Sequence, residues 1–261
     1  MKQMYLGAQL YTLREHTTTP EDFRAAMKKV AEIGYKYVQA SGFYWDVVTP
    51  EIVAEATREN GLEVVLTHYP LKRIVEETEK VIEEHDLMGC NNIGLGMTNL
   101  SSPQHCENFI KKITPALEKI KAAGKTFLYH NHEYEFLSKV GDGNALDYIL
   151  ANTDPDVFKI TFCSYWCYYA KEDPAEAIRR YGNRIAATHI KDMLKYDSGI
   201  EDVKGLMTEA LTGIIDYDAV MQACDEQNIL WHFIEQDYVY MDAFDSMKIS
   251  HDNVKKRYNM K

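Results

Sequence analysis

Several histidines, carboxylates and one lysine directly follow short apolar runs, and these side chains could bind a metal or move a proton. The closest pair is His130 and His132, and two residues spaced by two along a strand face the same way. The other candidates, in chain order, are Gln9 with Tyr11, Ser41, His68, Asn99, Cys163, His189 with Lys191 and Asp192, and Glu235 with Gln236 and Asp237. Imidazole and carboxylate together suit Zn, Mn, Fe or Co better than Ca. The sequence therefore predicts a metal or proton-transfer site if the folded chain brings these groups together.

The elements that must position these groups recur about every 30 residues. Short runs rich in β-branched or aromatic residues predict eight strands, at 5–10, 37–40, 63–67, 92–95, 126–129, 158–162, 185–188 and 231–234. Helix starts are predicted where a capping residue precedes a proline, at Thr19-Pro20, Thr49-Pro50, Ser102-Pro103 and Asp173-Pro174. Left-handed helix ends are predicted at Gly34, Gly61, Gly89, Gly124, Asn152, Gly182 and Asn228.

Eight alternating strands and helices in 261 residues favour a single closed (β/α)8 barrel over an open doubly wound sheet. No GxGxxG motif follows any of the predicted strands, so a dinucleotide-binding fingerprint is absent. No linker or break in composition interrupts the chain, and we expect one domain over residues 1–261. In such a barrel, the functional groups lie at the carboxyl ends of the strands, where the candidate residues fall.

Charge and cysteine content exclude several classes of partner. Forty acidic against 29 basic residues give a formal net charge of -11, which disfavours binding to nucleic acid or to an acidic membrane. The sequence contains no apolar stretch long enough to cross a bilayer and no separate apolar signal region. Five cysteines without a CxxC pair are typical of reduced thiols, so we expect a cytoplasmic protein.

Five stretches, in order along nearly the whole chain, resemble the xylose isomerase-like TIM-barrel superfamily, and in particular its sugar phosphate isomerase/epimerase branch, which is related to inosose dehydratases. They are GAQLYTLR at 7–14, IGYKYV at 33–38, YHNHEYEF at 129–136, HIKD at 189–192 and IEQD at 234–237. The resemblance implies a divalent metal held by Glu, Asp, His and Glu at the ends of strands five to eight. His189 and Glu235 match that pattern, whereas His130 stands in place of the first Glu and Cys163 in place of the Asp.

These two replacements leave alternatives open. A Cys163 thiolate would make a set with His130, His189 and Glu235 that suits zinc or another borderline metal better than Mg or Mn. Alternatively, Cys163 is a small buried apolar residue, and metal affinity is weakened or lost. Loss of the first Glu also removes one of the two acid/base groups that an epimerase needs. Its neighbours Glu133, Glu135 and His132 are the candidates to replace it.

The remaining roles follow from position and from the resemblance. Glu235 is expected to act as both ligand and base, and Lys191 to stabilise an enediolate oxygen, while His68 resembles a family histidine that contacts substrate hydroxyls. Tyr11 and His132 are further expected to contact substrate. The aromatic side chains of Trp45 and Trp166 could cover a sugar ring or simply pack in the core. The aromatic run 165–169 is consistent either with a wall of the site or with a subunit contact. A homo-oligomer is therefore one of the alternatives.

Two functional classes remain. The first is an enzyme that uses a metal to remove a proton beside the carbonyl of a sugar or cyclitol, a step shared by isomerases, epimerases, dehydratases and lyases that cleave 3-keto-glycosides. The second is a barrel that binds a sugar without converting it. An apurinic endonuclease shares the expected fold but is disfavoured by the negative charge. The sequence lacks a glycine-rich phosphate loop, so we expect an unphosphorylated small-molecule substrate.

Overall fold

The computed structural model describes residues 2–194 and 206–261 and contains a closed barrel of parallel strands. Its strands are β1 (Tyr5–Gln9), β2 (Tyr37–Ala40), β3 (Glu63–Thr67), β4 (Asn92–Leu95), β5 (Thr126–His130), β8 (Phe158–Cys163), β9 (Ile185–Ile190) and β12 (Trp231–Ile234). They pair in this order, and β12 closes the ring against β1. The prediction of eight strands and of a (β/α)8 barrel is confirmed.

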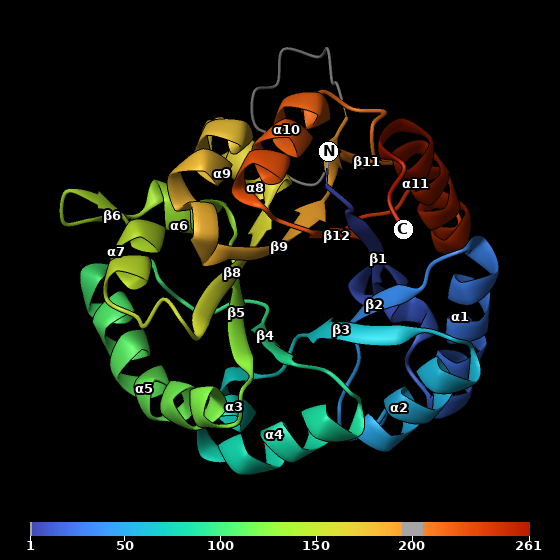
Figure 1. Cartoon of the computed structure of the whole chain (residues 1–261), viewed down its shortest axis with the longest axis horizontal. Helices are drawn as coiled ribbons and strands as arrows, with labels where there is room; N and C mark the ends of the chain where they lie inside the picture. Colours follow the sequence, from blue (N-terminus) through green and yellow to red (C-terminus); the bar gives the residue numbers. More distant parts are fainter. Residues whose placement is uncertain (1, 195–205) are drawn as a thin grey trace.

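Helices surround the barrel on its outside (Figure 1). They are α1 (Pro20–Ile33), α2 (Pro50–Glu59), α3 (Leu71–Glu76), α4 (Thr78–Leu87), α5 (Pro103–Ala122), α6 (Glu133–Leu137), α7 (Ala145–Ala151), α8 (Ser164–Tyr169), α9 (Pro174–Tyr181), α10 (Tyr217–Gln227) and α11 (Ala243–Tyr258), with 3-10 turns η1 (Leu10–His16) and η2 (Gly182–Arg184). Two short antiparallel pairs lie outside the barrel: β6 (Lys139–Val140) with β7 (Gly143–Asn144), and β10 (Asp192–Met193) with β11 (Met207–Thr208). None of the helices in the described residues is long and apolar enough to cross a membrane.

Most helix ends follow the predicted capping chemistry. Each of the four predicted prolines opens a helix, namely α1, α2, α5 and α9. Gly34 ends α1 at φ 116° and Asn228 ends α10 at φ 60°, both in the left-handed region. The prediction for Asn152 is wrong, because its φ is -111°. Its side-chain amide instead donates to the Tyr148 carbonyl at 2.8 Å, which satisfies the helix end without a left-handed turn.

The interior of the barrel is filled below the candidate site. Leu66, Leu128, Ala187 and Phe233 form a buried cluster inside the ring of strands. Gly7 makes room for this cluster, since a Cβ at that position would lie 2.5 Å from the Phe233 ring. The barrel is therefore a packed core that supports the groups at its carboxyl end, as in other (β/α)8 folds.

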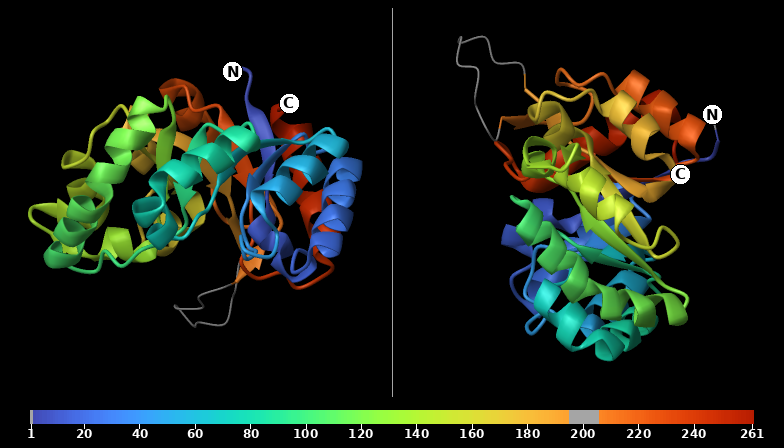
Figure 2. Two further views of the ribbon diagram at one scale, coloured as in Figure 1. Left: turned by 90° about the horizontal axis from the view of Figure 1, so that it is seen from below. Right: turned by 90° about the vertical axis from the view of Figure 1, so that its left-hand side faces the viewer.

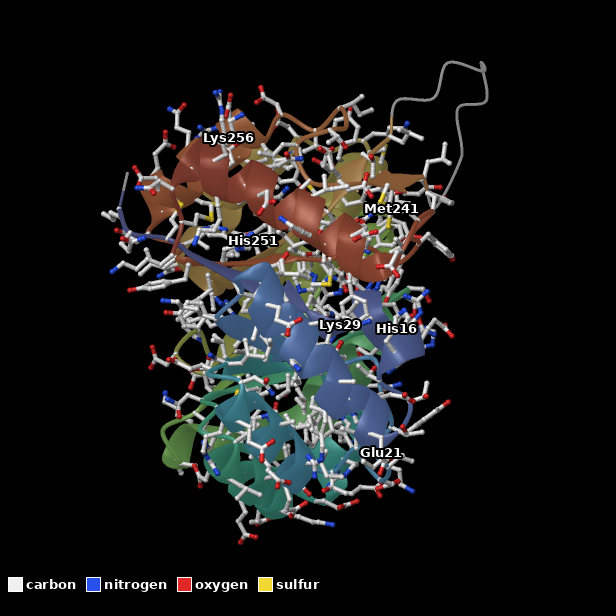
Figure 3. The ribbon with its side chains drawn as sticks, turned by 90° about the vertical axis from the view of Figure 1, so that its right-hand side faces the viewer. His16, Glu21, Lys29, Met241, His251 and Lys256 are labelled. Atoms are coloured by element: carbon white, nitrogen blue, oxygen red, sulfur yellow. The ribbon has the colours of Figure 1, made fainter. Side chains whose placement is uncertain are left out.

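The two ends of the chain meet where the barrel closes (Figure 2). The backbone N–H of Leu6 donates to the Lys261 carbonyl at 2.8 Å, and the Lys261 N–H donates to the Met4 carbonyl at 3.0 Å. Helix α11 lies beside α1 (Figure 3), and the Lys29 ammonium lies 4.4 Å from the centre of the Phe244 ring between them. These contacts join the C-terminus to β1 and α11 to α1, next to the pairing of β1 with β12 that closes the barrel.

Thr19 and Thr49 provide a matched test of the capping chemistry. The Thr19 hydroxyl accepts a hydrogen bond from the Asp22 N–H at 3.1 Å, whereas Thr49 makes no such bond to its helix. We expect Thr19→Ala to lower the free energy of unfolding by about 1 kcal/mol. Thr49→Ala should cost clearly less, as measured by urea denaturation of both variants. An equal loss of unfolding free energy in both variants would show that the Thr19 cap bond does not stabilise α1 measurably.

Candidate functional site

The carboxyl ends of the strands surround a cavity of about 340 Å³. Nine of the candidate residues from the sequence line it: Gln9, Tyr11, Ser41, Trp45, His68, His130, His132, Glu235 and Asp237. The loops after β2, β3 and β4 add an apolar wall that includes Phe43, Tyr69 and Met97. The cavity is large enough for a small organic ligand. It lies at the end of the barrel where this fold places its chemistry.

Four other predicted residues, Cys163, His189, Lys191 and Trp166, are buried and do not line the cavity. Cys163 and His189 are fully buried, and Lys191 is 1% exposed. Trp166, on α8, is also buried, and its ring centre lies 5.3 Å from the Lys191 ammonium. Trp166 therefore packs on the lysine and does not line the cavity, which differs from the expected sugar-covering position.

A compact set of donor atoms is formed by three strand ends. Ligand-type atoms of His130, Cys163 and His189 all lie within 4.8 Å of one another. Glu235 adjoins the set, because its Oε2 lies 2.8 Å from His189 Nδ1. The structure thus brings together the four residues proposed from the sequence as ligands, from β5, β8, β9 and the segment after β12.

Hydrogen bonds at the far side of each imidazole leave the nitrogens facing this centre available. His130 Nδ1 lies 3.2 Å from the Gly96 carbonyl and donates to it, while His130 Nε2 is buried and has no hydrogen-bond partner among the described residues. His189 Nε2 lies 2.7 Å from Gln39 Oε1 and donates to it, so a neutral His189 ring has its Nδ1 lone pair towards the centre. Metal-binding histidines typically show this arrangement, in which the second nitrogen donates to an oxygen.

The donor set fits a divalent metal. His189 Nδ1 and Glu235 Oε2 lie 2.8 Å apart, and this approach is stabilised either by a proton on His189 Nδ1 or by a cation that both atoms bind. Burial raises the pKa of Cys163 to about 12, so its thiol stays neutral until a cation stabilises the thiolate. Asn131 accepts a hydrogen bond from the Cys163 N–H at 2.9 Å and so fixes the end of β8. Two imidazoles, a thiolate and a carboxylate suit zinc in particular.

Lys191 supplies a fixed positive charge beside the donor set. Its Nζ lies 2.6 Å from Glu235 Oε2 and 2.7 Å from Asp237 Oδ2. Burial would lower the pKa of Lys191, but the two carboxylates raise it well above its ordinary value, so the side chain is an ammonium. Burial would likewise raise the pKa of Glu235, but a protonated His189, through its charge and its hydrogen bond, and the ammonium of Lys191 hold it well below its usual range. Glu235 is therefore an ionised carboxylate.

Tyr217 and Gln9 hold these charged groups in place. The Tyr217 hydroxyl lies 2.8 Å from both the N and the O of Lys191, and 2.7 Å from the Ser164 hydroxyl. Gln9 Nε2 donates to Glu235 Oε1 at 2.8 Å. Sequence reasoning placed Gln9 at a strand end but missed Tyr217, because Tyr217 opens α10 and not a strand-end segment. Only the fold brings it to the lysine.

His68 occupies a space left by two glycines of the fourth strand and its loop. A Cβ at Gly94 would lie 3.1 Å from His68 Cδ2, and a Cβ at Gly96 would lie 3.0 Å from His68 Nδ1. His68 Nε2 lies 2.7 Å from Gln39 Nε2, which donates to it. Gln39 was missed as a site residue by sequence reasoning. Its only signal was a single amide within the apolar run of β2.

The residues considered as replacements for the missing family Glu lie in different places. His132 lines the cavity, whereas Glu133 and Glu135 do not. Glu135 is fully buried behind the strand, where it accepts hydrogen bonds from the Tyr129 hydroxyl and from the His132 N–H. Glu135 therefore cannot contact a ligand in this cavity, and His132 is the neighbour that can.

Two further strand-end residues serve the loops and not the cavity. Asp192 accepts hydrogen bonds from the backbone N–H groups of Gly213 and Ile215 at 2.9 and 3.2 Å. Gln236 accepts one from the Ser246 hydroxyl at 2.6 Å. Their polarity is explained by these contacts, so neither needs a ligand.

Comparison with known proteins identifies the family. The chain belongs to the xylose isomerase-like TIM barrel family, whose sequence model matches residues 27–244. An inosose dehydratase of Clostridium perfringens (strain 13 / Type A) is 23% identical over 241 residues, which cover 79% of each chain. The solved structure of a sugar phosphate isomerase/epimerase from Parabacteroides distasonis has a TM-score of 0.79 at 21% identity and covers 99% of this chain and 100% of that one. An L-ribulose 3-epimerase has a TM-score of 0.74 at 14% identity, with 97% and 94% covered. These structural likenesses support the fold alone.

Glu135 gives the protein a pH-dependent stability. Burial raises the pKa of Glu135 to about 8, against a value near 4.5 in the unfolded chain, so the folded state holds a proton that the unfolded state loses. Its stabilising contribution is complete below about pH 4.5 and is lost as the pH rises through 8. We expect the unfolding free energy of the wild type to fall by a few kcal/mol over this range.

Glu135→Gln should remove most of this decline, because the amide does not titrate. Denaturation curves at pH 5 and pH 8.5 measure the effect, with the exposed Glu118→Gln as the control. An equal pH dependence in wild type and Glu135→Gln would show that another group is responsible.

Proposed function

We propose that this protein is an enzyme that removes a proton beside the carbonyl of a sugar or cyclitol, with a divalent metal, favoured as zinc, bound by His130, Cys163, His189 and Glu235. The single observation that carries the proposal is the 2.8 Å approach of two ligand-type atoms, His189 Nδ1 and Glu235 Oε2, next to a buried imidazole nitrogen without a partner among the described residues. When bound, the metal would supply Lewis acidity that polarises the substrate carbonyl.

The chain's own residues supply the proton transfer. Glu235, ionised and at the cavity wall, is the proposed base. A carboxylate of low pKa is a weak base, so the reaction requires strong stabilisation of the enediolate that forms. Lys191 is proposed to provide part of it, since its ammonium is held against Glu235 and Asp237 in a buried environment where charge interactions are strong.

The cavity supports a neutral substrate. Among the described residues that line it there is no arginine and no lysine, and the ammonium of Lys191 beside it already contacts two carboxylates. A phosphate group would therefore lack a free cationic partner. His68, His132 and Tyr11 are proposed to contact hydroxyl groups of the substrate, with Trp45 at the apolar wall.

A second candidate reaction, elimination, has a specific observation in its favour. The carboxylates at the cavity wall, Glu235 and Asp237, both follow β12, so they approach a ligand from the same side of the barrel. Epimerisation needs an acid/base group on each face of the carbon, whereas elimination of water needs one base and an acid near the leaving hydroxyl. His132, from the β5 side, is the proposed acid. The similarity to an inosose dehydratase is in accord with this reaction.

Exchange of substrate protons with deuterated water tests the proposal. Keto sugars, inososes and 3-keto-glycosides are incubated with the zinc-loaded protein, and deuterium incorporation and product are followed by NMR. We expect exchange with at least one class, and a loss of at least about 100-fold in Glu235→Gln. The exposed Glu118→Gln serves as control. No exchange with any class would favour a sugar-binding barrel, and exchange unaffected in Glu235→Gln would remove Glu235 as base.

Cys163→Asp tests the assignment of the thiol as a ligand. Replacing a soft sulfur by a hard oxygen of similar size should shift the metal preference from zinc towards manganese. Competition titrations of both metals against wild type and variant measure the ratio of dissociation constants. We expect this ratio to change by at least about 10-fold. An unchanged ratio would show that Cys163 packs beside the metal without binding it.

A further inference from the structure

One amide side chain joins two buried histidines of the site. Gln39, on β2, donates from Nε2 to His68 Nε2 at 2.7 Å and accepts at Oε1 from His189 Nε2 at 2.7 Å. Gln39 is fully buried. A buried amide is costly without partners, so its orientation is set by these two rings.

The chemistry of an amide links the protons of the two rings. Its oxygen only accepts, and its nitrogen only donates, so one facing ring nitrogen must carry a proton and the other must not. A neutral imidazole carries one proton, at either Nε2 or Nδ1. When His189 is protonated at Nε2, His68 must therefore be protonated at Nδ1. A 180° turn of the Gln39 amide reverses both tautomers.

We propose that Gln39 is a positioning residue that couples the tautomers of His68 and His189, so that a divalent cation at His189 Nδ1 makes His68 Nδ1 a hydrogen-bond donor at the cavity wall. The role of the cation rests on the proposed function, whereas the coupling of the two rings does not.

The surroundings of both rings support two alternative states. In the orientation observed, a neutral His189 ring has its Nδ1 lone pair beside Glu235, where a cation can bind. In the reversed orientation, His189 Nδ1 would donate to Glu235 Oε2 across the same 2.8 Å, which closes the site to a cation. His68 Nδ1 would then be an acceptor. A cation selects the first state because it requires the lone pair.

His68 is placed so that its tautomer affects its hydrogen bond to a ligand. It lines the cavity, and its Nδ1 lies beside Gly96, which lines the cavity as well. Burial lowers the pKa of His68 to about 3, so the ring is neutral at ordinary pH and must adopt one tautomer or the other. As a donor, His68 Nδ1 would bind a carbonyl or hydroxyl oxygen of the substrate.

Nitrogen NMR of protein labelled with ¹⁵N-histidine tests the coupling, because the ¹⁵N shifts report which ring nitrogen carries the proton. Spectra of wild type, Gln39→Glu and Gln39→Met are recorded at pH 8, with and without Zn²⁺. The control is Gln236→Met, which alters a buried glutamine that contacts Ser246 and neither histidine. Zinc affinity is measured by competition with a chelator.

In the wild type, we expect one of the two rings, and not both, to carry an Nε2 proton in every sample. With zinc bound, that ring should be His189. In Gln39→Glu, both rings should carry an Nε2 proton, because a carboxylate accepts at both oxygens. Gln39→Met should weaken zinc binding by about 10- to 100-fold, the usual effect of losing the partner of a ligand histidine. Gln236→Met should match the wild type in both measurements.

Two results would overturn the proposal: tautomers in Gln39→Glu identical to those of the wild type, or undiminished zinc affinity in Gln39→Met. A wild type that binds no zinc, but in which His68 and His189 are protonated at different nitrogens, would support the coupling. The same result would contradict the role of the cation here and the metal in the proposed function. The spectra therefore separate failure of the coupling from failure of the proposed function.

Discussion

A buried carboxylate that must be neutralised is the constraint on which the site depends. Glu235 is 3% exposed and ionised, and transfer of an unpaired carboxylate into such an environment costs several kcal/mol. The ammonium of Lys191, the imidazole of His189 and the amide of Gln9 each contact one of its oxygens. Each of these groups comes from a different strand end than Glu235, so the closed barrel is what brings the compensating groups together.

The same constraint explains why the neighbouring groups are themselves fixed. Lys191 is held by Asp237 and by the hydroxyl of Tyr217, and His189 is held by Gln39. A buried polar network of this kind is stabilising only when every member is satisfied. His130 Nε2 has no partner among the described residues, and the contact between His189 Nδ1 and Glu235 Oε2 needs either a proton or a cation. A cation there completes it, and this is the physical reason for assigning a metal to the centre.

The fold could be predicted from local sequence, since its signals are local. The barrel strands could be located to within one or two residues from runs of β-branched residues. The helices between them were marked by capping residues before prolines and by glycines at helix ends. Asn152 is the exception, because a side-chain amide can satisfy a helix end without a left-handed turn, and sequence does not distinguish the two. Residues directly after strands, such as His130 and Glu235, could likewise be collected from a rule about where strands end.

The supporting residues could not be predicted, because their roles depend on contacts between distant segments. Tyr217 opens a helix yet contacts Lys191. Gln39 lies inside a strand yet joins His68 to His189, and His189 is 150 positions from Gln39 along the chain. Glu135 shows the converse: its position in the HNHEYE segment suggested a site residue, but it lies on the outer side of the strand with Tyr129. Which face a residue takes after a strand ends depends on the turn that follows.

X-ray absorption at the zinc edge of the metal-loaded wild-type protein tests the central claim most directly, because it reports the atoms bound to the cation. The account predicts a four-coordinate zinc with one sulfur at about 2.3 Å and nitrogen or oxygen ligands at about 2.0 to 2.2 Å. A spectrum without sulfur, showing only oxygen ligands in a six-coordinate shell, would contradict it. The cation would then be bound elsewhere, and the buried network around Glu235 would have to be explained by Lys191 alone.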